Sequence, residues 1–151
     1  MPTVQSTYGL MTGARVGQIA EENDSQVLIS RTVETGALAH GAVALQGTND
    51  NGAKPADNSG ARFKGIVVRT QSMDASKSPI DSFAVGSEAR IMNKGVIWVT
   101  VGANVAAGDA AYYTTAGAIT NTSNTGANPA IPNGVFESTA TNGNLAKLRL
   151  A

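Results

Sequence analysis

The chain contains no cysteine, and His40 is the only histidine among its 151 residues. The first absence excludes disulfides, thiolate metal ligands and a cysteine nucleophile. The second excludes, within one chain, a multi-histidine metal site and a catalytic triad with a histidine base. The sequence also lacks a nucleophile elbow, a Walker phosphate loop and a dinucleotide-binding glycine fingerprint. We therefore expect a protein that is not an enzyme and that holds no metal and no cofactor.

Charged residues are also scarce. They make up 15% of the chain, and eleven basic residues balance eleven acidic ones, whereas a typical soluble domain has about 25% charged residues. The nearest approach to a basic cluster consists of Lys54, Arg62, Lys64 and Arg69, and Asp57 interrupts it. Nucleic acid binding needs clustered Lys and Arg, so we expect no nucleic acid partner. A surface of small and uncharged polar residues loses its water cheaply, which suits a protein that is largely covered by neighbours.

Long apolar runs are missing as well. No segment approaches the roughly 18 apolar residues of a membrane helix, and the amino terminus lacks the basic start and apolar core of a signal peptide. We therefore expect no membrane partner and synthesis in the cytoplasm.

Short β-branched and aromatic segments dominate what remains. Residues 94–102 form the most continuous of them, with apolar residues on both faces of the expected strand, so we place this strand at the centre of a sheet. Further strands are expected at residues 27–33, 65–70, 83–92, 108–113, 117–120, 135–140 and 146–150. Asn93, Lys94 and Gly95 are expected to form a hairpin loop before the central strand, and Asn142-Gly143 a hairpin turn before the last one. No segment shows a sustained helical stripe. The predicted fold is all-β: an antiparallel β-sandwich or jelly-roll-like barrel.

The expected domain organisation is simple. Residues 1–20 are interpreted as an extended N-terminal arm, although a loose terminus that starts the first strand is an open alternative. Residues 21–151 are expected to form a single all-β domain. Long polar loops are predicted at residues 48–60 and 121–133.

A short motif recurs along the chain. An apolar residue, a glycine three positions later and an alanine three positions after that occur at Leu38-Gly41-Ala44, Phe83-Gly86-Ala89 and Val105-Gly108-Ala111. Each copy reads as a strand end that turns at glycine into a new strand. The first and third copies are also followed by a long polar loop and a strand led by glycine, at Gly65 and Gly134. These features suggest an internal structural repeat, although chance can produce the pattern in a chain rich in Gly and Ala.

The acidic residues give no sign of a reaction. Asp109 and Glu88 are the carboxylates nearest to strands, and each follows a turn glycine, where carboxylates commonly cap backbone N–H groups. Residues 49–52 resemble part of a calcium loop, but the first and last positions that such a loop needs hold Gly47 and Asn58. We interpret this segment as a turn.

Four large side chains are candidate partner contacts. Tyr8, Leu10 and Met11 are isolated apolar residues in the arm, where they could seat in a neighbouring subunit. Trp98 lies in the central strand, where it could belong to the core, to an interface or to a sugar-stacking platform.

Several segments together resemble the structural cement, or decoration, proteins of tailed-bacteriophage heads. The segments are residues 16–20 (VGQIA), 41–43 (GAV), 105–113 (VAAGDAAYY), 117–120 (GAIT) and the closing strand from residue 134 (GVF). The resemblance spans nearly the whole chain and implies a virion protein on the outer capsid surface, with no catalytic residues. It also implies a symmetric oligomer that fastens neighbouring subunits of the major capsid protein, and we expect that oligomer to be a homodimer or homotrimer. A receptor- or glycan-binding β-module on a virion is the alternative.

Overall fold

The computed structural model describes residues 13–22, 26–70 and 82–151. Its strands are β1 (Ile19–Glu21), β2 (Val27–Val33), β3 (Leu38–Ala39), β4 (Val43–Gln46), β5 (Gly52–Pro55), β6 (Phe63–Val67), β7 (Ser82–Phe83), β8 (Glu88–Thr100), β9 (Ala110–Tyr113), β10 (Ile119–Thr120), β11 (Ala130–Phe136) and β12 (Leu145–Leu150), with one short 3-10 turn, η1 (Asn124–Gly126). The predicted all-β fold is confirmed. No helix in the described residues is long and apolar enough to cross a membrane.

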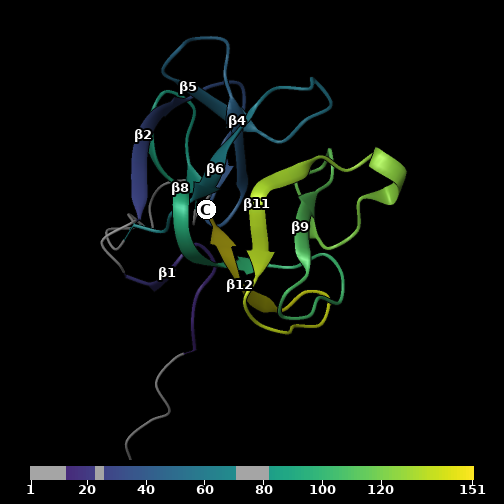
Figure 1. Cartoon of the computed structure of the whole chain (residues 1–151). Helices are drawn as coiled ribbons and strands as arrows, with labels where there is room; N and C mark the ends of the chain where they lie inside the picture. The colour runs from purple at the N-terminus through teal and green to yellow at the C-terminus, as the bar shows by residue number, and fades with distance from the viewer. Residues whose placement is uncertain (1–12, 23–25, 71–81) are drawn as a thin grey trace, which may run out of the picture.

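Five strand segments close into a small barrel, which we call barrel 1. The first half of β8 pairs with β2, β2 with β5, β5 with β4, β4 with β6, and β6 returns to β8. Every pair is antiparallel except β2 with β5, which is parallel. In Figure 1 these strands form the upper group of the molecule.

The second half of β8 belongs to another ring of strands, barrel 2. It pairs with β12, and β11, β9 and β10 follow in that order, all antiparallel. The ring closes where the N–H of Gly102 donates to the carbonyl oxygen of Ile119 at 2.7 Å, beside a parallel bridge between Val101 and Ile119. Because β8 runs through both barrels, it connects them rigidly (Figure 1).

The hairpin predicted at Asn93, Lys94 and Gly95 is wrong, because β8 is one strand of 13 residues. The chain does not reverse at these residues, since β2 pairs with β8 from Glu88 as far as Lys94, and β12 pairs with it from Gly95 onward. Asn93 and Lys94 are exposed, and Gly95 has a φ of 132°. Polar residues and glycine thus mark the bend at which the strand leaves one sheet for the other.

The two barrels are copies of one structural repeat. Repeat 1 covers residues 27–92 and repeat 2 covers residues 94–150. Three residue pairs across neighbouring strands recur in both repeats. In repeat 1 they are Val43–Ile66, Ile29–Ile91 and Leu38–Phe83. The corresponding pairs of repeat 2, in the same order, are Ala110–Val135, Ile97–Leu148 and Val105–Ala140. Gly65 and Gly134 occupy the same position in β6 and β11, just before Ile66 and Val135. The suggested internal repeat is therefore present in the structure.

Each repeat contains two turns of the same kind. The third of the four turn residues is a glycine with a φ between 74° and 96°, as a type II turn requires. The N–H of the fourth residue donates to the carbonyl oxygen of the first at 3.0 to 3.1 Å. The backbone N–H of the glycine also donates to the carbonyl oxygen of a residue elsewhere in the barrel. The backbone N–H of that residue donates in return to the carbonyl oxygen of the residue that follows the glycine. We call this arrangement a glycine clasp. The clasps join Gly41 to Val67, Gly86 to Val33, Gly108 to Phe136 and Gly143 to Val101, at 2.7 to 3.0 Å.

The sequence motif marks three of these four turns. The fourth copy, Ala140-Gly143-Ala146, does not match the motif as defined, because alanine replaces the larger apolar residue at its start. The alanine that ends each motif is fully buried in a strand. The motif therefore encodes both the turn and the close packing of the strand that follows it.

The repeats also bury equivalent side chains. In barrel 1 the buried interior consists of Val33, Leu38, Ala44, Ala53, Val67, Ala89 and Ile91. The equivalent positions of barrel 2 are filled by Val101, Val105, Ala111, Ile119, Phe136, Ala146 and Leu148, all of them buried. Alanine is frequent in both sets because a five-stranded barrel leaves little interior space. Neighbouring residues of β4, β6 and β8, such as Val43, Ile66 and Met92, face the other way and pack in the same apolar cluster as barrel 2.

Most strand predictions are confirmed, with shifted ends. The strand at residues 27–33 is β2 exactly as bounded, and Ala146, Leu148 and Leu150 are buried in the last strand as expected. The two long polar loops are shorter than predicted. The first contains β5, and β11 begins at Ala130 within the second. The strand predicted at residues 83–92 is divided by the turn at Gly86 into β7 and the start of β8.

Candidate functional site

Trp98 lies on the outer face of barrel 2. Its side chain is half-buried and belongs to neither buried cluster, so the interior is not its place. Lys147, its partner across the β8–β12 ladder, holds its Nζ 5.6 Å from the centre of the indole ring. The same Nζ lies 3.4 Å from a carboxylate oxygen of Glu21 on β1. The ring is therefore held in place and keeps an accessible face.

The N-terminal segment joins the domain at Trp98. A fifth glycine clasp, formed by residues 15–18, has Gly17 N–H donating to the Trp98 carbonyl at 2.8 Å and Trp98 N–H donating to the Gln18 carbonyl at 2.9 Å. Arg69 adds two bonds: its Nε donates to the carbonyl of Val16 at 3.0 Å and its N–H to that of Gly17 at 2.7 Å. These hydrogen bonds hold residues 16–18 against Trp98 and Arg69.

The other predicted contacts, Tyr8, Leu10 and Met11, lie outside the described residues. The predicted boundary between an arm of residues 1–20 and a domain of residues 21–151 stays a prediction. Within that arm, β1 begins at Ile19, which pairs with Ile97 of β8 and packs against the buried cluster.

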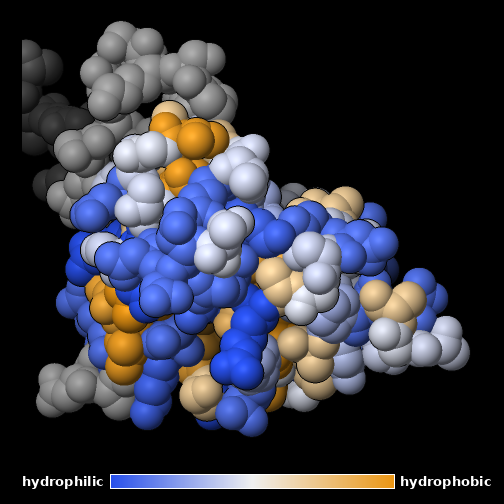
Figure 2. All heavy atoms as spheres, turned by 90° about the horizontal axis from the view of Figure 1, so that it is seen from above, coloured by the Kyte–Doolittle hydropathy of each residue, from blue (hydrophilic) through white to orange (hydrophobic). Residues whose placement is uncertain are grey.

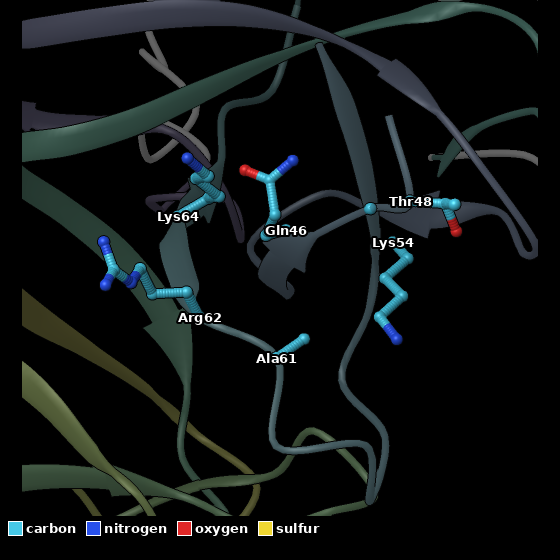
Figure 3. A pocket seen from close by; sticks show the side chains of 7 residues that line it. Gln46, Thr48, Lys54, Ala61, Arg62 and Lys64 are labelled. Carbon is cyan, nitrogen blue, oxygen red and sulfur yellow. The ribbon is translucent and has the colours of Figure 1, made fainter. Parts of the chain in front are cut away.

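A pocket of about 410 Å³ opens on barrel 1, where β4, β5 and β6 meet. It is lined by Gln46, Gly47, Thr48, Lys54, Ala61, Arg62 and Lys64. We call it the basic pocket. Figure 3 shows Arg62 and Lys64 on one side of it and Lys54 and Thr48 on the other. These cations are recognisable in the sequence, but the pocket is not, because only the pairing of β4 with both β5 and β6 brings them together.

One of the three cations is neutralised inside the chain. The Nζ of Lys54 lies 2.7 Å from Asp57, and Ser59 donates to the same carboxylate from its N–H and its hydroxyl. These bonds, the one to Lys54 first, lower the pKa of Asp57 to about 2. Among the residues that the structure describes, no carboxylate forms an ion pair with Arg62 or Lys64. The pocket therefore carries two uncompensated positive charges.

Asp109 and Glu34 serve as turn caps, whereas Glu88, the other carboxylate singled out in the sequence, is exposed at the start of β8. Asp109 accepts hydrogen bonds from the N–H of Ala106 and from the amide of Asn121, which lower its pKa. Glu34 accepts the N–H groups of Thr48 and Asn49, which also lower its pKa. In residues 13–22, 26–70 and 82–151, no group of three His, Cys, Asp or Glu side chains could hold a metal ion.

His40 is a structural residue of a turn. It is buried, and its ring meets the Phe83 ring edge-on with 5.4 Å between centroids. It stands before Gly41 in a glycine clasp. The histidine thus serves packing.

The described surface has few exposed large apolar residues, Val27 and Val85 being the two. Figure 2 shows hydrophilic groups over most of one face, with apolar atoms in separate small areas between them. Scattered apolar residues of this kind are normal for a soluble protein and mark no site by themselves.

A family model and two solved structures resemble this chain. Residues 4–151 match the family model described as structural cement protein (E217 gp24/Pam3 gp6). A chain from the capsid of Myoviridae phage XM1 superposes with a TM-score of 0.75 at 17% identity, covering 99% of this chain and 98% of that one. The N base of head fiber gp8.5 of bacteriophage phi29 gives a TM-score of 0.46 at 13% identity, over 83% of this chain and 94% of that one. No curated protein matches the sequence.

Proposed function

We propose that this chain, which belongs to the structural cement protein family, binds the outer surface of a phage head and bridges neighbouring subunits of the major capsid protein. Membership of the family makes it a structural, non-enzymatic protein of the virion. The match over residues 4–151 is the observation that carries the proposal. The bridging role, the outer-surface position and assembly as a homodimer or homotrimer are the proposed part.

The rigidity of the fold supports this role. A protein that clamps two subunits must keep the distance between its contact surfaces. Here β8 continues from barrel 1 into barrel 2, and the cluster of Ile66, Met92 and Ile97 is fully buried between strands of both. Phe63 of barrel 1 also stacks on Tyr113 of barrel 2, with 5.9 Å between ring centroids. The two ends of such a body can each bind a different subunit without bending.

The composition supports a largely covered surface. With 15% charged residues and no net charge, the chain can bury polar area against a partner while leaving few charges unpaired. A specific interface buries about 1,600 Å² in total. Many symmetry-related copies acting across seams add avidity that no single contact has.

We propose that the N-terminal arm, residues 1–20, extends to a neighbouring subunit and contacts it. Tyr8, Leu10 and Met11 are apolar residues that a neighbouring subunit could cover. The arm joins the domain beside Trp98, through the Gly17 clasp, so the arm and the half-buried indole can share one contact surface. We propose these four residues as capsid contacts.

Image reconstruction of heads decorated with the purified protein tests this function. We expect density for each copy on the outer surface, in contact with two different major capsid subunits and with one or two further copies. Density on the inner surface, or contact with a single capsid subunit, would contradict the proposal.

A further inference from the structure

We propose that the basic pocket receives a carboxylate-bearing segment of the capsid partner, held by Arg62 and Lys64. This inference rests on the proposed binding to the head, and it adds which chemistry the partner must present. The partner residues would be aspartate or glutamate side chains.

The two cations lie on one face of the chain. Arg62 and Lys64 are two positions apart along an extended segment, so their side chains point to the same side. Phe63, between them, turns the other way and packs on the buried cluster and on Tyr113. Arg62 is exposed and Lys64 half-buried. Their backbone is thus anchored through Phe63, while their charged ends face the pocket.

The opposite wall of the pocket is ordered by hydrogen bonds within the chain. The amide of Gln46 donates to the carbonyl of Asn49 at 2.7 Å, and Glu34 accepts the N–H of Thr48 at 2.6 Å. Lys54, paired with Asp57, is only 16% exposed at its side chain. A pocket with preset walls loses little conformational entropy when it binds, which favours affinity.

Repeat 2 shows that the fold does not need these charges. The N–H of Gln46 donates to the Arg62 carbonyl at 2.8 Å, and in repeat 2 the N–H of Tyr113 donates to the Pro129 carbonyl at 3.0 Å. The segment from Pro129 to Asn133, which follows that bond, contains no charged residue. The same strand pair therefore forms with and without cations. Folding does not require Arg62 and Lys64, which leaves both charges available for binding.

The number of charges favours a carboxylate partner over nucleic acid. Two free cations on a chain with no net charge are well below the roughly 6 to 10 phosphate contacts that give strong binding to DNA. No aromatic side chain lines the pocket, so stacking of a base has no platform. One or two carboxylates match both the size and the charge of the site, and arginine binds a carboxylate through two parallel hydrogen bonds.

The test compares two double variants in binding to heads that lack the protein. R62Q/K64Q removes the pocket charges, and R90Q/K94Q removes two exposed charges from β8 as a matched control. We expect R62Q/K64Q to bind about tenfold or more weakly and with a shallower salt dependence, because a charge pair at an interface contributes to affinity and is screened by salt. The control should stay within about twofold of the wild type. Thermal unfolding of each variant verifies that it is folded.

The outcomes separate this inference from the proposed function. If R62Q/K64Q is folded and binds as the wild type does, the pocket inference is wrong and head binding stands. An equal loss in both double variants would also overturn it, because a general charge effect would explain the result. Binding of duplex DNA by the wild type, lost in R62Q/K64Q, would assign the pocket to phosphates instead. If the wild type does not bind heads, the proposed function itself fails.

Discussion

Val33 and Val101 are held in the same way in the two halves of the molecule. Gly86 donates its N–H to the carbonyl of Val33 at 2.9 Å, and Gly143 donates its N–H to that of Val101 at 2.8 Å. Each valine returns a hydrogen bond to the residue after the glycine and is buried in the core of its barrel. Strand ends are usually where a sheet frays, and here a turn from the other side of the barrel holds each end in place.

The glycines of the fold should differ sharply in their tolerance of alanine. Gly143 needs a φ of 86° but has free space around it, so G143A should cost about 1 to 2 kcal/mol from backbone strain alone. At Gly65 a Cβ would lie 2.2 Å from the backbone oxygen of Met92, so G65A should cost more than about 3 kcal/mol or prevent folding. Exposed Gly13 is the control, and G13A should change stability by less than about 0.5 kcal/mol. Urea unfolding measures all three, and equal effects would contradict the structure.

The interior of barrel 2 should be intolerant of a cavity. Phe136 is fully buried and occupies the place that Val67 has in barrel 1, so Phe136→Ala should lower the unfolding free energy by about 3 to 5 kcal/mol. Val85, 59% exposed in its turn, is the control, and Val85→Ala should change it by less than about 0.5 kcal/mol. Calorimetry gives both values. A small effect at Phe136 would show that barrel 2 is not packed as described.

Acid should remove the contribution of Asp57 to stability. Its pKa falls from the ordinary 3.8 to about 2, so the charged form is favoured by folding. The stabilisation is complete above the unfolded pKa and is lost as the pH falls through the folded one. The melting temperature of the wild type should therefore exceed that of D57N at neutral pH, and the difference should disappear between about pH 4 and pH 2. A difference that stays constant to pH 2 would contradict the assigned bonds.

The fold could be predicted from the sequence to the extent that turn chemistry and strand alternation are local. β12 alternates apolar and polar residues from Ala146 to Leu150, β2 is rich in β-branched residues, and the glycine motif identified three of the four repeat turns. The bend in β8 could not be predicted, because Asn93-Lys94-Gly95 suits a hairpin equally well. What decides between bend and hairpin is that β2 pairs with β8 as far as Lys94 and β12 pairs with it from Gly95 onward, and both are long-range contacts.

The candidate site was less predictable. The sequence shows Lys54, Arg62 and Lys64 separated by Asp57, and it gives no reason to count that carboxylate against Lys54 alone. Only the 2.7 Å distance between Lys54 Nζ and the Asp57 carboxylate shows that Asp57 pairs with Lys54 and leaves Arg62 and Lys64 without a carboxylate partner among the described residues. The equivalent strand pair of repeat 2 forms without charged residues, so the fold does not need these charges. This equivalence can be recognised only when the strand register of both repeats is known.

Removal of residues 1–12 should weaken binding to heads and leave the domain folded. The first described hydrogen bonds of the chain begin at Arg15 and Gly17, beyond the deletion. The melting temperature of the truncated protein should therefore match the full chain, while its affinity for heads falls because Tyr8, Leu10 and Met11 are lost. Unfolding of the truncated protein would show instead that these residues belong to the core.

Trp98 should matter more for binding than for folding. Its ring is half-buried outside the core clusters, and its contact with the Lys147 ammonium is worth about 0.5 to 1 kcal/mol at an exposed site. Trp98→Ala should therefore reduce affinity for heads with a small change in melting temperature. Lys147→Gln, which keeps the ring, is the control and should bind as the wild type does. Binding unchanged in Trp98→Ala would remove this residue from the proposed contact surface.

The most direct test of the central claim is the heat resistance of heads that lack the protein, measured with and without purified protein at micromolar concentration. A ligand that binds only the assembled shell lowers the free energy of that state, so bound heads should release their contents at a higher temperature than bare heads. Protein that fails to bind heads, or that binds without raising this temperature, would contradict the account.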